Sequence, residues 1–598
     1  MSAAHVEVQG LRITVRTPDG ERAIVDDVSF AIPRGEILAL IGESGSGKTT
    51  IALSLMGYTR FGARIAGGTI RVGERRIDHL DDGGLALLRG RHISYIAQSA
   101  ASAFNPSLTI MAQVIEPLLV HRLASHADAE AKAIGLFRAL ALPQPETIGS
   151  RYPHQVSGGQ LQRLMAAMAL ITDPELVILD EPTTALDVTT QVEVLKAFKT
   201  ALGRSKATAI YVSHDLAVVA QMADRIAVLQ HGTLREEGRA AQVLGAPANA
   251  YTRTLLAAAR PSQRPVTVPT EASVLTVGNV TAGYGKLQGG LPSIPVLQDV
   301  SFALGRGETL GVIGESGSGK STLARVISGL LPRATGSVRL DGEELPKGLS
   351  GRSRDQFRRV QLVFQNADTS LNPAQSVGQI LARPLSLFHG MTGSAAEARV
   401  AELLDLTKLP REIAARRSFE LSGGQKQRVN LARALAAEPD VLLCDEVTSA
   451  LDTVVGAAIL ELIDELRRRL GIATVFISHD ISTVRAFCDK VLVLYGGTAV
   501  EQASSAAFAQ GPNHPYASLL MESVPEMQSG WLERTPVRPG AGPGDEHRNL
   551  CRFLPRCPVS IAGSCDTLPP PLRDVAAHRW LCHHEPAALA AQHKEFAA

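Results

Sequence analysis

The same ordered set of short polar motifs occurs twice along this chain of 598 residues. Each set begins with a glycine-rich octapeptide and continues with a glutamine, a Ser-Gly-Gly-Gln tetrapeptide, an Asp-Glu pair and a histidine. Matching residues lie 272 positions apart at the lysine of the octapeptide, 267 apart at the glutamine and 265 apart from the tetrapeptide onward. A spacing that changes so little indicates a tandem duplication, so the chain is predicted to fold as two similar domains.

Length and composition agree with two folded domains. The chain is long enough for two domains of about 250 residues, each with a hydrophobic core of its own. Hydrophobic residues make up 45% of the chain and charged residues 20%, as in water-soluble globular proteins. Because 60 Lys and Arg nearly balance 59 Asp and Glu, no strong field favours nucleic acid as the main partner.

From the sequence we expect neither a membrane span nor a signal peptide. No apolar run approaches the roughly 20 residues needed to cross a bilayer. Residues 1–10 lack a basic region followed by an apolar stretch, which a secretory signal requires. We therefore expect the chain to stay in the cytoplasm.

Apolar runs that predict buried strands lead into the polar motifs. In the first copy, residues 36–41 precede the octapeptide, 176–179 precede the Asp-Glu pair and 207–212 precede the histidine. Strands that alternate with helices predict an α/β domain with a mainly parallel sheet, which binds ligands beyond the carboxyl ends of its strands. The other expected elements are β-rich runs at 6–15 and 23–32, helices at 48–56 and within 111–142, and second-copy strands at 308–313, 441–443 and 473–477.

The repeat also predicts the domain boundaries. The first domain is expected at 1–257 and the second at 273–525, with a cysteine-rich extension at 526–598. The linker between the domains is expected at 258–272. Residues 260–270 contain three prolines and no apolar periodicity, which indicates a short, semi-rigid connection.

The glycine-rich octapeptides have the pattern of phosphate-binding loops. Glycines allow a tight turn in which successive backbone N–H groups and a helix N-terminus face the phosphates of a nucleotide. Lys48 and Lys320 would bring a positive charge to the phosphates, and Thr49 and Ser321 a hydroxyl to Mg²⁺. A glycine-rich turn without a ligand is the alternative, which two matches between a strand and a helix disfavour. The predicted ATP-binding residues here are Gly42, Ser44, Gly45, Ser46, Gly47, Lys48, Thr49, Thr50, Gly314, Ser316, Gly317, Ser318, Gly319, Lys320, Ser321 and Thr322.

The Asp-Glu pairs follow apolar strands and have carboxylates suited to hydrolysis. Asp180 and Asp445 can hold the hydration shell of Mg²⁺. Glu181 and Glu446 are placed to orient or deprotonate an attacking water, so we predict that they are catalytic. An acidic pair that merely ends a strand in solvent is the alternative, and the surrounding motifs disfavour it.

With its Ser-Gly-Gly-Gln tetrapeptides, the chain resembles the nucleotide-binding subunits of ABC transporters over nearly its whole length. The family signature is matched by Ser157, Gly158, Gly159 and Gln160 and by Ser422, Gly423, Gly424 and Gln425, and other P-loop ATPases lack it. The resemblance implies two P-loop NTPase domains of the ABC type. Each would have a mainly parallel sheet core, an antiparallel β subdomain and a helical subdomain.

The resemblance assigns roles to the remaining repeated residues. Gln98 and Gln365 match the glutamines that touch Mg²⁺ and report the nucleotide state to a membrane partner. His214 and His479 match the switch histidine at the γ-phosphate, so we expect them to be catalytic; a structural histidine is the alternative, which the shared Ser-His-Asp context disfavours. Because both copies keep the Glu and the His, both sites are predicted to hydrolyse ATP.

In this family the signature of one module completes the ATP site of the other. The Lys48 loop would pair with the Ser422 tetrapeptide, and the Lys320 loop with the Ser157 tetrapeptide, head to tail within one chain. Asp187 and Asp452 match the D-loop positions between the modules.

The sequence departs from the family pattern in a few places. Val156 replaces a leucine before the first signature, and Val447 stands where the first copy has Pro182. Tyr284 matches the aromatic residue that stacks on adenine, but the first copy has Val15 there. A missing ring weakens nucleotide binding modestly, so the two sites are expected to differ in affinity.

Short segments after the glutamines resemble those of oligopeptide, dipeptide and nickel importers, and so does the end of the second domain. They include Asn105-Pro106, Asn372-Pro373 and 513–520, with a weaker echo at 249–256. The resemblance implies a transport ATPase that uses ATP and Mg²⁺ and energises uptake of peptides. Its partners would be two transmembrane permease subunits and an extracytoplasmic solute-binding protein, with peripheral attachment to the cytoplasmic face of a bacterial inner membrane. Nickel, glutathione and haem remain alternative cargoes.

Four of the six cysteines lie near the C-terminus: Cys551, Cys557, Cys565 and Cys582. A Pro-rich segment of this kind needs a staple because it cannot form much of a core, and a cytoplasmic location disfavours disulfides. The spacing resembles the cysteine motif of peptide-importer ATPases, which can hold a [4Fe–4S] cluster; zinc and free thiols are the alternatives. Cys444 and Cys488 lie in apolar stretches and are expected in the core.

Two functions of another class are weighed against the importer. A soluble double-ABC ATPase acting on ribosomes or DNA usually has a longer charged linker or inserted zinc modules, unlike this chain. An assembly scaffold with silent sites is disfavoured by the retained Glu and His residues.

Overall fold

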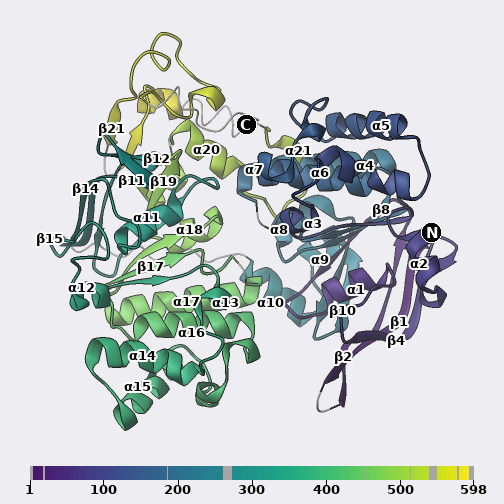
Figure 1. The fold of residues 1–598 in the computed structure, drawn as a ribbon, viewed down its shortest axis with the longest axis horizontal. Helices are drawn as coiled ribbons and strands as arrows, with labels where there is room; N and C mark the ends of the chain where they lie inside the picture. The colour runs from purple at the N-terminus through teal and green to yellow at the C-terminus, as the bar shows by residue number, and fades with distance from the viewer. Residues whose placement is uncertain are drawn as a thin grey trace. The chain divides into compact units, whose positions relative to one another are not determined.

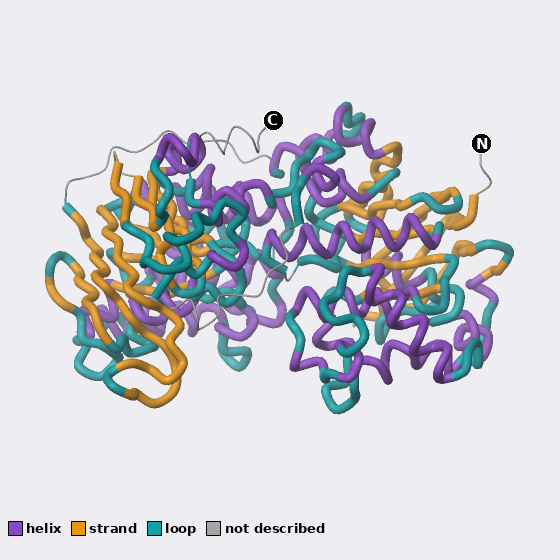
Figure 2. The backbone as a smooth tube through the Cα atoms, turned by 90° about the horizontal axis from the view of Figure 1, so that it is seen from above, coloured by secondary structure: helices purple, strands orange, loops and turns teal. Residues whose placement is uncertain are grey.

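The computed structural model describes residues 4–17, 20–184, 186–259, 272–449, 451–511, 513–537, 549–575 and 578–590. The chain forms two compact units (Figure 1). The first comprises residues 1–260, 452–454 and 525–537, and the second comprises 261–451, 455–524 and 538–598. Each unit combines helices with strands (Figure 2). Residue 525, predicted as the end of the second domain, and residues 526–537, predicted as the start of the extension, thus group with the first unit. Most of the expected linker lies outside the described residues.

The first unit has two sheets. A four-stranded antiparallel sheet has the order β2-β1-β4-β5, and a six-stranded sheet has the order β10-β9-β3-β8-β7-β6, parallel except at β10. The strands are β1 (Ala4–Thr17), β2 (Gly20–Pro33), β3 (Ile37–Ile41), β4 (Ala63–Val72), β5 (Arg75–Arg76), β6 (Ile93–Ile96), β7 (Leu176–Asp180), β8 (Thr208–Val212), β9 (Arg225–Gln230) and β10 (Thr233–Arg239). Strands β3, β7 and β8 are buried throughout, which explains why their sequences are continuous apolar runs.

Helices of the first unit cover this sheet and form a helical subdomain between β6 and β7. They are α1 (Lys48–Ser54), α2 (Asp82–Leu88), α3 (Ala100–Ala103), α4 (Ile110–Val120), α5 (His126–Ala139), α6 (Gly158–Leu170), α7 (Val188–Ser205), α8 (Leu216–Met222), α9 (Ala240–Gly245), α10 (Ala250–Ala258) and α21 (Trp531–Arg534). In Figure 1, α4 lies beside α5 and α6. The stretch 111–142 forms the two helices α4 and α5, because the Ser125 side chain caps a new helix by accepting from the backbone N–H of Asp128.

The second unit repeats the two-sheet plan. Its sheets have the orders β12-β11-β14-β15 and β16-β17-β18-β13-β19-β20-β22-β21. The strands are β11 (Ser273–Gln288), β12 (Leu291–Gly305), β13 (Thr309–Ile313), β14 (Thr335–Leu340), β15 (Glu343–Glu344), β16 (Val360–Val363), β17 (Val441–Asp445), β18 (Ala473–Ile477), β19 (Lys490–Tyr495), β20 (Thr498–Ser504), β21 (Leu572–Val575) and β22 (His578–Leu581). The helices are α11 (Lys320–Ile327), α12 (Arg354–Arg359), α13 (Ala367–Ser370), α14 (Val377–His389), α15 (Gly393–Leu406), α16 (Gly423–Leu435), α17 (Thr453–Leu470), α18 (Ile481–Phe487), α19 (Ser505–Gln510) and α20 (Pro515–Glu522).

The fold class is therefore as predicted: two α/β domains, each with a mainly parallel sheet, an antiparallel β subdomain and a helical subdomain. The cysteine-rich extension adds two strands to the second sheet, because β22 pairs antiparallel with β20. Trp580 of β22 is buried with Cys582 and Leu589 in a small cluster. In the part of the chain that the structure describes, we find no helix with the length and apolarity of a membrane span.

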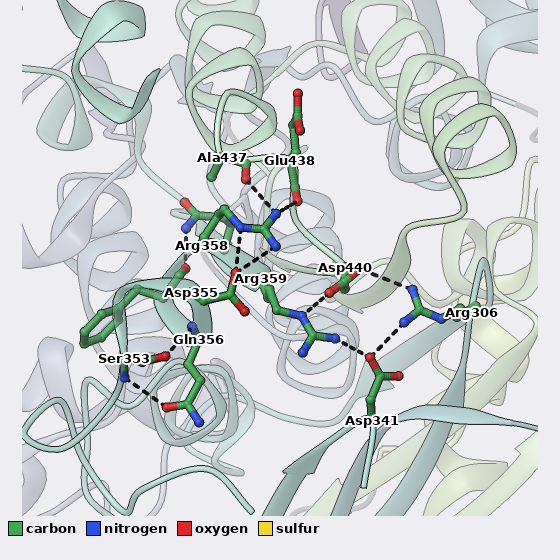
Figure 3. A network of polar contacts seen from close by, with 12 residues as sticks. Arg306, Asp341, Ser353, Asp355, Gln356, Arg358, Arg359, Ala437, Glu438 and Asp440 are labelled. Carbon is green, nitrogen blue, oxygen red and sulfur yellow. Dashed lines mark hydrogen bonds and ion pairs between the residues drawn. The ribbon is translucent and has the colours of Figure 1, made fainter. Parts of the chain in front are cut away.

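An ion-pair network fixes the start of two strands that lead to the second site (Figure 3). Arg359, directly before β16, contacts both Asp440, directly before β17, and Asp341. Arg306 completes the ring, with distances of 2.8 Å to Asp341 and 3.2 Å to Asp440. Because β16 and β17 are paired in register, anchoring one end of both strands also fixes the residues at their other end.

Candidate functional site

Strand order brings the repeated motifs of each copy to one edge of its sheet. Strands β3, β8, β7 and β6 are neighbours, and they end at the phosphate-binding loop, His214, the Asp-Glu pair and Gln98. Strands β13, β18, β17 and β16 arrange the second copy in the same way. Parallel strands have their carboxyl ends at the same edge, so each copy gathers one polar site.

The first phosphate-binding loop is closed around its lysine. Lys48 Nζ donates to the carbonyl oxygens of Gly42 (2.7 Å) and Glu43 (2.8 Å). Gly42 has φ +141°, and a Cβ there would lie 2.1 Å from the carbonyl oxygen of Leu229, so only glycine fits. Burial lowers the pKa of Lys48, although nearby carboxylates oppose this shift.

The second loop has the same geometry. Lys320 Nζ donates to the carbonyl oxygens of Gly314 (2.8 Å) and Glu315 (3.0 Å). In both loops a glycine with positive φ, Gly47 or Gly319, precedes the helix that begins at the lysine. The predicted loop residues Ser44, Gly45, Ser46, Ser316, Gly317 and Ser318 lie within these turns, and Thr50 and Thr322 lie in the first turns of α1 and α11.

A hydroxyl and a carboxylate meet in each site at the expected Mg²⁺ position. Thr49 Oγ1 donates to Asp180 Oδ1 and Ser321 Oγ donates to Asp445 Oδ1, both at 3.0 Å. Burial raises the pKa of both aspartates, against the effect of these hydrogen bonds. Oxygen donors of this kind fit Mg²⁺, which binds proteins through one or two such groups together with phosphates and water.

The predicted catalytic glutamates are each held by a glutamine and a histidine. Gln98 Nε2 donates to Glu181 Oε2 at 3.1 Å, and His214 Nδ1 lies 3.1 Å from Glu181 Oε1. Burial disfavours charge on both partners, but their mutual hydrogen bond lowers the pKa of Glu181 and raises that of His214. The carboxylate is thus ionised, as a general base must be.

The second glutamate has the same partners. Glu446 lies 2.5 Å from Gln365 Nε2 and 2.5 Å from His479 Nε2. Burial, the largest single influence, raises the pKa of Glu446, but the hydrogen bonds and charges of His479, Lys320 and Gln365 together outweigh it, so the pKa is lowered. Glu181 and Glu446 also share a left-handed backbone, with φ of 48° and 51°, an unusual conformation for this residue type that directs both side chains in the same way.

The signature tetrapeptides begin helices α6 and α16. Ser157 and Ser422 are exposed N-caps whose hydroxyls accept from the N–H of Gln160 (3.3 Å) and Gln425 (3.4 Å). The second glycine of each signature packs against the next helix: a Cβ at Gly159 would lie 2.2 Å from Thr190, and one at Gly424 would lie 2.5 Å from Val455. Gly158 and Gly423 are exposed, so the backbone at the N-terminus of both helices is accessible to an anion. Asp187 caps the N-terminus of α7.

Three tyrosines contact the sites without having been predicted. The Tyr95 hydroxyl donates to Asp180 Oδ2 at 2.8 Å, whereas the second copy has Leu362 at the matching position. The hydroxyls of Tyr251 and Tyr516 accept from the backbone N–H of the second residue of each loop, at 3.1 and 2.8 Å. Tyr251 lies in the segment 249–256 and Tyr516 in the similar segment 513–520. The similarity of these two segments was the feature of the sequence that could have predicted both tyrosines.

Strand register places Val15 and Tyr284 at equivalent positions. In the first unit, Ile13 of β1 pairs with Val25 of β2, and two residues later Val15 pairs with Arg22. In the second unit, Ala282 of β11 pairs with Leu297 of β12, and two residues later Tyr284 pairs with Ile294. The Tyr284 ring is 38% exposed. The second site therefore has a partly exposed aromatic ring where the first has a small aliphatic side chain.

The four C-terminal cysteines line one pocket. Cys551, Cys557, Cys565 and Cys582 surround it, together with His514 and others. Burial raises the pKa of Cys557 to about 12 and of Cys582 to about 11, and neighbouring cysteines act in the same direction. Within the described part of the chain, no three or more His, Cys, Asp or Glu side chains are spaced to bind one metal ion. Cys444 and Cys488 are buried elsewhere, as expected.

Comparisons with known proteins show the family of the chain. A family model described as ABC transporter matches residues 25–184 and 297–449, and one described as Oligopeptide/dipeptide transporter, C-terminal region, matches 500–565. The chain is 37% identical over 558 residues to the glutathione import ATP-binding protein GsiA of Salmonella choleraesuis (strain SC-B67), which covers 87% of this chain and 89% of the relative. The protein of the same name from Escherichia coli (strain K12) is 36% identical over 559 residues, with the same shares covered.

Solved structures of ATP-binding cassettes are also similar to parts of the chain. The structure of cbiO1 from Clostridium perfringens, part of the ABC transporter complex cbiONQ, is 28% identical with a TM-score of 0.36 and covers 39% of this chain and 90% of that one. A post-hydrolysis structure of the cassette MJ0796 bound to ADP and Pi is 25% identical with a TM-score of 0.36, covering 39% of this chain and 98% of that one.

Proposed function

The chain belongs to the ABC transporter family as the ATP-binding protein of a peptide- or glutathione-type importer, and on that premise we propose that it energises uptake of short peptides. It is an ATPase coupled to transport. The proposal of a peptide cargo is supported by the match of residues 500–565 to the C-terminal region of oligopeptide and dipeptide transporters. Glutathione, itself a tripeptide, is the first cargo to test because the relatives named above import it.

We propose two composite ATP sites, formed head to tail. The Lys48 loop would work with the Ser422 signature and the Lys320 loop with the Ser157 signature. Support comes from the exposed helix N-termini at both signatures, which are suited to a phosphate group. Both sites would hydrolyse ATP, since each has an ionised glutamate next to a histidine.

Binding of ATP would close the modules, and hydrolysis would reopen them. In both sites the catalytic glutamate is bonded to the glutamine that, by family resemblance, reports to the membrane partner. Nucleotide and Mg²⁺ would compete for that glutamine, which gives a physical route from the site to two permease subunits. We place the protein peripherally on the cytoplasmic face of the inner membrane, with an extracytoplasmic solute-binding protein delivering the cargo.

We further propose that the cysteine pocket holds a [4Fe–4S] cluster. Four thiols around one pocket match the number of ligands that such a cluster needs, whereas zinc requires donors that converge on a single ion. The cluster would cross-link the extension and add a redox-active centre. Ligation requires loss of the thiol protons, which burial otherwise holds on Cys557 and Cys582.

The function is tested by purifying the tagged protein anaerobically from native membranes in mild detergent and identifying the bound proteins by mass spectrometry. Two polytopic permeases and a solute-binding protein are expected, and binding assays on the latter identify the cargo. Recovery with ribosomes or DNA-repair proteins would overturn the importer proposal.

The cluster is tested on the same material by iron, acid-labile sulfide and zinc analysis. Cys551→Ser should lose the iron, whereas Cys444→Ser, at a buried cysteine outside the pocket, should keep it. Zinc, or no metal in the wild-type protein, would refute the cluster.

A further inference from the structure

The cysteine-rich extension contacts the second phosphate-binding loop directly. Arg556, in a short 3₁₀ helix (Leu554–Arg556) between Cys551 and Cys557, forms a two-pronged ion pair with Glu315. Its Nη1 lies 2.8 Å from Oε2 and its Nη2 lies 2.9 Å from Oε1. Glu315 is the second residue of the loop that holds Lys320. An arginine 241 positions away thus holds a side chain of the ATP-binding loop.

This ion pair is largely shielded from water. The exposed fraction is 8% for the Arg556 side chain and 17% for that of Glu315. The guanidinium also lies 6.0 Å from the ring centre of Tyr495 and 5.8 Å from that of Phe553. Paired guanidinium and carboxylate groups in such surroundings are screened little by salt and have a defined geometry.

The same aromatic cluster supports the loop backbone. The N–H of Glu315 donates to the hydroxyl of Tyr516 (2.8 Å), and the Tyr516 ring packs on Tyr495 and Phe553 at 4.4 and 5.4 Å between ring centres. Phe553 belongs to the extension and follows Cys551 by two residues. The loop, the sheet and the extension therefore share one packed contact.

The first loop differs at this point. Glu43 occupies the position of Glu315, and its N–H donates to Tyr251 in the same way. Among the described residues, however, no arginine or lysine forms an ion pair with Glu43, and the extension follows only the second module in the sequence. The arginine clamp is thus specific to one of two otherwise similar loops.

We propose that Arg556 is a positioning residue that couples the cysteine-rich extension to ATP binding at the second loop. The carboxylate of Glu315 carries the same sign of charge as the phosphates of ATP and would oppose their binding. Arg556 neutralises that charge and holds the loop in its closed turn. Loss of order around the cysteines would release Arg556 and weaken ATP binding at the second site, while the first site would be unaffected. The proposal rests on ATP binding by the second module and is independent of whether the cysteine pocket binds a metal.

The test measures ATP affinity by calorimetry in the full chain, one site at a time. Lys48→Ala leaves only the second site, and Lys320→Ala leaves only the first. In the Lys48→Ala background, Arg556→Ala should weaken ATP binding about 5-fold or more, the lower range of measured couplings between sites. In the Lys320→Ala background the same substitution should change nothing.

A rescue variant separates positioning from general destabilisation. If Arg556 acts through the charge of Glu315, adding Glu315→Gln to Arg556→Ala should restore most of the affinity, which it cannot do for a misfolded domain. Arg579→Ala is the matched control and should leave the affinity unchanged, because Arg579 lies in the extension, is 56% exposed and pairs with Asp574.

Unchanged affinity in Arg556→Ala, or a loss that Glu315→Gln does not restore, would overturn the proposal. If the Lys48→Ala protein alone fails to bind ATP, the premise about the second site is at fault and not the coupling.

Discussion

Exchange of the residues at positions 15 and 284 should change the ATP affinities of the two sites in opposite directions. Stacking of a base on an aromatic side chain contributes about 1–3 kcal/mol by alanine substitution, which corresponds to about 5- to 150-fold in affinity. Tyr284 is 38% exposed and its hydroxyl accepts from Arg325 Nη1 at 3.2 Å. Because this ring is only partly available to a base, we expect the lower half of the range for Tyr284→Ala.

Tyr284→Phe separates the ring from its hydroxyl. It keeps the stacking surface and loses the hydrogen bonds of the hydroxyl with Arg325 and Thr322, so its ATP affinity should stay closer to wild type than that of Tyr284→Ala. In the first site, Val15→Tyr should strengthen binding by about 2- to 10-fold, because aromatic contacts add ~0.5–1.5 kcal/mol beyond the area buried.

Calorimetric titration with ATP measures each change separately when it is done in the Lys48→Ala protein, which keeps only the second site, and in the Lys320→Ala protein, which keeps only the first. The reasoning fails if Tyr284→Ala binds ATP as tightly as Tyr284→Phe, because the ring would then contribute nothing. Improved binding of Val15→Tyr in the Lys320→Ala background, with no change in the Lys48→Ala background, would show that the substituted residue acts in its own site.

Three further outcomes are expected. Glu181→Gln and Glu446→Gln should each lower ATP hydrolysis at least 100-fold at their own site, as loss of a general base does, with ATP binding retained. Phosphate release is measured in the Lys320→Ala and Lys48→Ala proteins, which each keep one site, and a rate equal to that of the unsubstituted glutamate would contradict the catalytic role. Trp531→Ala should cost about 3–5 kcal/mol at a 4% exposed side chain and release its segment to trypsin, whereas unchanged digestion would show that the contact is dispensable. Arg359→Ala should lower the free energy of unfolding of the second module by about 1–3 kcal/mol in a denaturant titration, since Arg359 is 18% exposed and both Asp341 and Asp440 lose an ion pair. Arg306→Ala, at a side chain that is 49% exposed, should lower it less.

The main framework of both sites could be predicted from the sequence because it depends on short segments. A strand, a turn rich in glycine and a helix are adjacent in the chain, and their residue types dictate the phosphate-binding loop around Lys48. The burial of β3, β7 and β8 follows from continuous apolar runs, so the end positions of Asp180 and His214 could be predicted as well.

Contacts between distant segments could not be predicted in this way. Nothing near Arg556 in the sequence indicates that it reaches Glu315, because its neighbours suggested only a cysteine motif. The hydrogen bond of Tyr95 to Asp180 has no counterpart in the second copy, so comparison of the repeats could not find it. The pairing of β22 with β20 depends on a strand of four residues, which is too short to be recognised by alternation.

The segment 525–537 makes the first unit discontinuous along the amino-acid sequence. Trp531 and Leu532 are part of the first unit's helical core, and the Gln221 side chain donates to the carbonyl oxygens of Glu526 (2.7 Å) and Gln528 (2.5 Å). An open reading frame cut after residue 260 would therefore encode a first half that lacks its own last helix. Such a half should be less stable than it is in the full chain and should be rescued by co-expression of residues 525–537, supplied either as a peptide or within the second half.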